Sequence, residues 1–138
     1  MFRLGRRSKK NLAEAKHDLQ RVVNRALEIL SIKMKVDISV VDGARTIEEQ
    51  RENVDNGVSW TMDSRHLVDP TDGLCFAVDI YPWYLGETNH NEFLYAKIAK
   101  AMFQAAIELG VDIEWGGFWK TPDRPHWQLS RRSYPKPN

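Results

Sequence analysis

The chain has 138 residues, of which 42% are hydrophobic and 28% are charged, and its formal net charge is +1. This length fits one domain with a core of its own, and the composition excludes a disordered or membrane-embedded chain. The balanced charge argues against nucleic acid as the main partner, and the single cysteine, Cys75, excludes an internal disulfide and a cysteine-based zinc site.

The N-terminal part is predicted to form scaffold. Residues 1–10 are rich in Arg and Lys, and we expect them to form a flexible tail that could attract an anionic surface. Apolar residues then recur at three- and four-residue spacing up to Leu30, which predicts a helix that begins at Asn11 with Glu14 as its capping partner. The β-branched run 36–41 predicts a strand.

A second helix and a long loop follow. Thr46 and Glu49 are spaced as a capping box and predict a helix that ends near Asn56. Arg45 lies in the turn before this helix, a position that attracts anions. Residues 59–73 then read as a long loop, a kind of segment that often carries function.

The run 75–81 predicts the most informative strand. Alternation places Phe76, Val78 and Ile80 on one apolar face and Asp79 on the other, beside small residues. An unpaired buried carboxylate is costly, so Asp79 needs a cation. A metal ion fits this place, and a salt bridge to an arginine is the structural alternative.

The C-terminal half is predicted to contain a helix over 91–109 that ends at Gly110, a strand over 111–115 and a last strand up to Leu129. In that last strand His126 and Gln128 share one face, whereas Trp127 lies on the other. Residues 131–138 are expected to form a flexible tail. The expected fold is one α+β domain over 1–138, with a small antiparallel sheet flanked by helices and a zinc site on the sheet.

Three side chains are candidate zinc ligands: His66, Asp79 and His126. Two imidazoles and one carboxylate hold a single zinc ion and leave a fourth position open, as in catalytic sites. Asp123 precedes His126 by three residues and is a candidate general base for an attacking water. His17 and His90 are interpreted as solvated residues outside the site.

Three motifs in this order resemble the zinc D-alanyl-D-alanine peptidase superfamily, which includes hedgehog-like domains: Ser64-x-His66, Ala77-x-Asp79 and Asp123-x-x-His126. Further residues look most like the phage L-alanyl-D-glutamate endopeptidase branch, namely Gly43, Arg45, Thr46, Gln50 and the Gly-Gly-x-Trp stretch at 116–119. Asp79 follows His66 by 13 positions, a longer separation than this family usually has. The sequence does not decide whether the acidic loop between them binds a regulatory ion.

The resemblance implies zinc ligation by His66, Asp79 and His126, and catalysis by Asp123. It also implies that Arg45 contacts the substrate or the developing negative charge and that Ser64 supports the site. The substrate would be the peptide stem of peptidoglycan. Three tryptophans are considered for a groove that binds it: Trp60 and Trp119 as lining residues, and Trp127 as a packing residue.

The implied protein is an endolysin that acts as a monomer. Because no signal peptide or transmembrane stretch is apparent, we expect it to remain in the host cytoplasm until a separate membrane-permeabilising protein lets it reach the wall in the periplasm. A carboxypeptidase or dipeptidase of the same superfamily and a non-catalytic zinc-binding recognition domain remain as alternatives. A nucleic-acid-binding module ranks last, because no such motif occurs.

Overall fold

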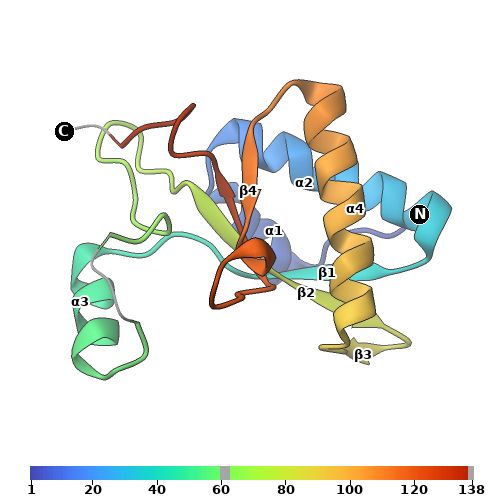
Figure 1. Cartoon of the computed structure of the whole chain (residues 1–138), viewed down its shortest axis with the longest axis horizontal. Coiled ribbons are helices and arrows are strands. Elements are labelled where there is room, and N and C mark those ends of the chain that lie inside the picture. Colours follow the sequence, from blue (N-terminus) through green and yellow to red (C-terminus); the bar gives the residue numbers. More distant parts are fainter. Residues whose placement is uncertain (60–62, 137–138) are drawn as a thin grey trace.

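The structure is a computed structural model that describes residues 1–59 and 63–136 (Figure 1). Trp60, a predicted groove residue, lies outside the described residues. The elements in chain order are α1 (Arg6–Ala13), α2 (His17–Ile29), the π-helical turn η1 (Leu30–Met34), β1 (Asp37–Asp42), α3 (Ile47–Asp55), β2 (Ala77–Tyr84), β3 (Glu87–Thr88), α4 (Glu92–Leu109), β4 (Ile113–Trp115), the 3-10 turn η2 (Gly116–Phe118) and β5 (His126–Leu129).

One antiparallel sheet organises the molecule, with strand order β1-β2-β5-β4 and with β3 paired to the end of β2. Helices α2 and α4 pack against each other, α1 contacts β1, and α4 contacts β2 and β4. Figure 1 shows α3 on the side of the molecule away from α2 and α4. Val78 and Ile80 of β2 are fully buried in the core, which leaves the opposite face of the strand for polar groups. The predicted α+β fold with a small antiparallel sheet is confirmed.

Several local predictions are also confirmed. Thr46 and Glu49 form the reciprocal capping box of α3, and Asn56 ends that helix. Asn91 caps α4 through the Phe93 N–H, and Gly110 ends it in the left-handed conformation with φ 68°. Within residues 1–59 and 63–136, none of the helices combines the length and apolar character needed to cross a membrane.

The prediction of one helix starting at Asn11 is wrong. Asn11 lies inside α1, where its side chain donates to the Val40 carbonyl at 2.8 Å. The chain leaves the helix after Ala13 because its backbone pairs with the segment that leads into β2: Cys75 N–H donates to Glu14, and Lys16 N–H donates to the Cys75 carbonyl. A long-range pairing therefore overrides the helical periodicity, and α2 starts only at His17.

Parts of the segments 1–10 and 131–138, which the sequence predicts as flexible tails, contact the rest of the fold. Leu4 is buried, and the buried Ser8 hydroxyl accepts the Val40 N–H at 3.0 Å. At the other end the Tyr134 hydroxyl donates to Asp18 at 2.6 Å, and Lys136 contacts Asp63 at 2.7 Å. The many basic residues of these two segments gave no indication of these few contacts. Residues 137–138 lie outside the described part.

Lys16 holds the long connection between His66 and β2. Its Nζ lies 2.7 Å from a carboxylate oxygen of Asp69 and 2.7 Å from one of Asp72. The Asp69 carboxylate also accepts the Thr71 N–H at 2.8 Å, and the two interactions hold the pKa of Asp69 at about 2. The sequence did not decide whether this loop binds a regulatory ion. In the structure the Lys16 ammonium group pairs with both Asp69 and Asp72. The lengthened loop is thus tied to the start of α2 and returns in register to the sheet.

Candidate metal centre

Strand pairing brings the three predicted ligands together. Asp79 lies opposite His126 in the β2–β5 pair, and it lies opposite Asp42 in the β1–β2 pair. A parallel bridge joins Arg45 to Leu67, and the Arg45 N–H donates to the His66 carbonyl at 2.8 Å. The loop that carries His66 is therefore fixed to the turn after β1, beside the polar face of β2.

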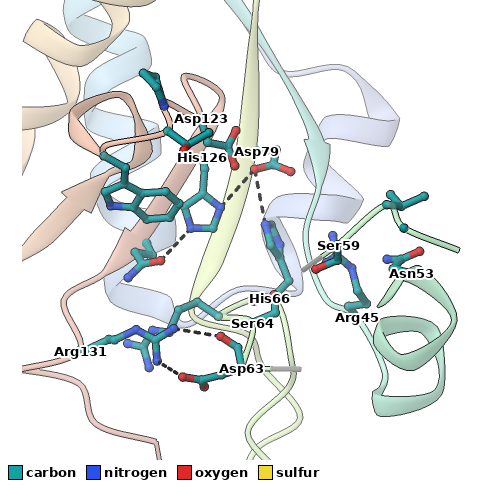
Figure 2. A pocket seen from close by; sticks show the side chains of 17 residues that line it. Arg45, Asn53, Ser59, Asp63, Ser64, His66, Asp79, Asp123, His126 and Arg131 are labelled. Atoms are coloured by element: carbon teal, nitrogen blue, oxygen red, sulfur yellow. Dashed lines mark hydrogen bonds and ion pairs between the residues drawn. The ribbon is translucent and has the colours of Figure 1, made fainter. Parts of the chain in front are cut away.

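The geometry of this cluster fits a metal ion. One ligand atom from each of His66, Asp79 and His126 lies within 4.8 Å of the others. Asp79 Oδ1 is 3.4 Å from His66 Nε2 and 3.5 Å from His126 Nδ1, the two contacts that Figure 2 marks with dashes. Tetrahedral zinc with bonds near 2.1 Å separates its ligand atoms by about 3.4 Å. These spacings are long for hydrogen bonds and match two ligands of one ion.

Asp79 itself supplies independent support. Its Oδ1 is buried and has no hydrogen-bond partner within the described residues. Burial opposes the charge on this carboxylate, but His126 and His66 outweigh it, so the pKa of Asp79 lies below its ordinary value. Burial also opposes a charge on His66, and Asp79 raises the pKa of that imidazole above its ordinary value. The centre thus favours a positive charge at the place where the three groups meet.

Each imidazole is oriented through the nitrogen that faces away from Asp79. His66 Nδ1 lies 2.8 Å from the Gly43 carbonyl, and His126 Nε2 lies 2.8 Å from Gln128 Oε1. Such acceptors fix the tautomer and leave the other nitrogen free to bind a metal. Gly43 is required here, because a Cβ would come within 2.5 Å of the Asn11 carbonyl oxygen.

Asp123 lies at the rim of the centre, in the turn before β5. Its backbone N–H donates to the Gly116 carbonyl at 2.8 Å, and a Cβ on Gly116 would approach the Asp123 carbonyl to 2.4 Å. Partial shielding from water and repulsion by Asp79 raise the pKa of the Asp123 carboxyl above its ordinary value, although both imidazoles act in the opposite direction. Figure 2 shows this carboxylate beside Asp79. It is thus placed to exchange a proton at the cluster.

A pocket of about 750 Å³ opens over the cluster. Among its lining residues are the three predicted ligands together with Asp123, Arg45, Ser64 and Trp119. Arg45 is held by Asp42 and by Gln50 Oε1, each at 2.7 Å. The Ser64 hydroxyl accepts the His66 N–H at 3.1 Å, and the Trp119 ring lies 4.9 Å from the His126 ring. The structure therefore brings every predicted site residue to one pocket.

Other residues of this pocket escaped prediction. Arg131 lines it and contacts Asp63 at 3.1 Å, although the sequence placed it in a tail. Arg65 also lines it, and the guanidinium is almost fully buried against the Phe76 ring at 4.0 Å. Its position directly before His66, a predicted ligand, is the sequence feature that could have placed Arg65 at the pocket. The packing role predicted for Trp127 is confirmed, since only 1% of it is exposed.

Comparisons with known proteins show the family of this chain. The profile of a family described as phage L-alanyl-D-glutamate peptidase matches residues 1–137. The L-alanyl-D-glutamate peptidase of Escherichia phage T5 is 31% identical over 137 residues, covering 96% of this chain and 93% of that protein. The crystal structure of the Serratia marcescens L-Ala D-Glu endopeptidase ChiX aligns with a TM-score of 0.82 and 39% identity, covering 96% of this chain and 94% of that one. The chain therefore belongs to the phage L-alanyl-D-glutamate peptidase family.

Proposed function

We propose that this chain is a zinc-dependent endopeptidase that hydrolyses the L-alanyl-D-glutamate bond in the peptide stem of peptidoglycan. The observation that carries the proposal is the buried Asp79 Oδ1, which lacks a hydrogen-bond partner among the described residues and faces two oriented imidazoles at the base of an open pocket. The phage T5 and Serratia relatives bear names that specify the same bond.

The residues divide the chemistry as follows. His66, Asp79 and His126 would hold one zinc ion. When bound, zinc supplies Lewis-acid activation of a water and of the scissile carbonyl. Asp123 takes the proton from the attacking water and returns it to the departing amine, a role that suits a carboxyl whose pKa is raised.

The remaining predicted residues bind and orient. Arg45 presents a guanidinium to the pocket and is held there by Asp42, so it can stabilise a substrate carboxylate or the negative charge of the tetrahedral state. Ser64 fixes the backbone of His66. Trp119, 36% exposed, packs on His126 and offers an apolar wall to the stem peptide. Asp123 beside the cluster argues against a non-catalytic recognition domain.

Digestion of purified peptidoglycan tests the bond specificity. The expected products carry a new carboxyl end on L-Ala and a new amino end on D-Glu, identified by mass spectrometry. Asp123→Asn protein loaded with zinc is the matched control and should release neither end at a comparable rate. Release of free terminal D-Ala without a new D-Glu amino end would instead identify a carboxypeptidase.

The proposal extends to the cellular setting. The chain acts as a monomer on the wall in the periplasm, and it waits in the host cytoplasm until a separate membrane-permeabilising protein gives it access. Expression alone should leave Gram-negative cells intact, whereas co-expression with such a protein should make the culture optically clear. Rapid lysis on expression alone would contradict this part and leave the assigned bond unaffected.

A further inference from the structure

A chain of two hydrogen bonds extends from His126 across the sheet. His126 Nε2 lies 2.8 Å from Gln128 Oε1, and Gln128 Nε2 donates to Glu114 Oε2 at 2.9 Å. Glu114 lies directly opposite Gln128 in the β4–β5 pair, so strand register sets this contact. Figure 2 draws the bond that leaves His126 on the side away from Asp79.

The donor and acceptor in each of these two hydrogen bonds follow from Glu114, the last residue in the series. A carboxylate only accepts hydrogen bonds, so the NH₂ group of Gln128 must face Glu114 and the amide oxygen must face His126. The imidazole Nε2 therefore carries the proton and donates. His126 Nδ1, 3.5 Å from Asp79, then keeps its lone pair for a metal ion.

His66 does not need such a third residue. Its Nδ1 faces the backbone carbonyl of Gly43, which can only accept. A glutamine amide, in contrast, can turn by half a rotation and offer its NH₂ group to the imidazole, which would place the proton on the nitrogen that faces Asp79. Gln128 is 3% exposed and His126 is 7% exposed, so water has little access to the Gln128 amide and does not set its orientation.

We propose that Glu114 is a positioning residue: it fixes the direction of the Gln128 amide and thereby keeps His126 Nδ1 as the metal-binding nitrogen. This inference rests on the proposed zinc function. Glu114 does not belong to the lining of the pocket over the cluster, and it acts on the centre only through Gln128.

The Glu114→Gln variant keeps a hydrogen-bonding side chain at position 114 but no longer forces the Gln128 amide to donate to it. The new side chain has the same size and can still accept from Gln128, but it can also donate, so both orientations of the Gln128 amide become possible. Long-range ¹H–¹⁵N NMR of the metal-free protein at alkaline pH should find His126 protonated on Nε2 alone in the unmodified chain. Glu114→Gln should show a mixture that includes the Nδ1–H form, and zinc affinity should fall by about 10–100-fold in a chelator competition.

Two further variants keep the test decisive. Asp112→Asn removes an acid next to β4 that contacts Ser133, not Gln128, and should keep the tautomer and the zinc affinity. In a Gln128→Leu background, Glu114→Gln should cause no further loss of zinc affinity, because the path to His126 is already broken. Thermal melts identify any variant that fails to fold.

An unmixed Nε2–H tautomer with unchanged zinc affinity in Glu114→Gln would overturn the inference. So would an equal loss of affinity in the Gln128→Leu background. The NMR readout uses metal-free protein and needs no substrate, so it stands apart from the proposed peptidase activity. A zinc-binding protein that cleaves no stem peptide would refute the proposed function and leave this inference intact.

Discussion

Replacing Asp123 with Asn should lower kcat by about 10²–10⁴-fold while the protein keeps its zinc, since this is the usual contribution of a positioned acid or base. The amide preserves the size of the side chain and can still accept a hydrogen bond, but it cannot take a proton from water. The backbone contacts of residue 123 with Gly116 and His126 do not involve the carboxylate, so the turn should persist. Stem-peptide turnover and metal analysis on the same sample measure both quantities.

Asp72→Asn is a suitable control, because this acid pairs with Lys16 in a loop outside the pocket lining. It should retain full turnover. Near-full activity of Asp123→Asn would move the general-base role to another carboxylate. Glu114 is the acid nearest to Asp123 along the sequence. It is a poor substitute, because its carboxylate accepts a hydrogen bond from Gln128 and lies outside the pocket lining.

The parts of the site that follow from local sequence pattern were predictable. Alternation in β2 separates Asp79 from the buried Val78 and Ile80, and the capping box at Thr46 places the turn that carries Arg45. The cost of burying an unpaired carboxylate is a local argument as well, and it required a cation at Asp79 before any partner was known. The motif order then indicated which histidines converge on it.

Features that depend on long-range pairing were not predictable. Periodicity gave no sign that Cys75 would pair with Lys16 and end α1 at Ala13. The contact between Glu114 and Gln128 depends on the register of β4 against β5, which a single sequence does not specify. The contacts made by the two ends of the chain were not predictable for a related reason. Composition describes their many basic residues, whereas the contacts of Ser8 and Tyr134 depend on partners far away in the sequence.

Replacing any one of His66, Asp79 or His126 with Ala should reduce bound zinc from about one ion per chain to none and abolish peptidase activity. Each residue is one of the three proposed protein ligands, so its loss leaves two, too few for a stable site. Metal analysis after dialysis, together with thermal unfolding with and without added zinc, provides the measurement. Zinc should raise the Tm of the unmodified chain, because a ligand that binds only the folded state stabilises it, and it should leave the Tm of the variants unchanged.

Asp79→Asn sharpens this prediction by separating metal binding from folding. The amide keeps the size of the side chain, so the metal-free variant should fold, and its Tm should fall only by the loss of the carboxylate charge that His66 and His126 stabilise. Its zinc affinity should nevertheless fall sharply. His17→Ala, at the exposed start of α2, removes an imidazole outside the cluster and should keep both zinc and activity. Full zinc occupancy in Asp79→Ala would place the third ligand elsewhere, and Asp69 or Asp72 could serve only by giving up the ion pairs with Lys16 that hold the lengthened loop.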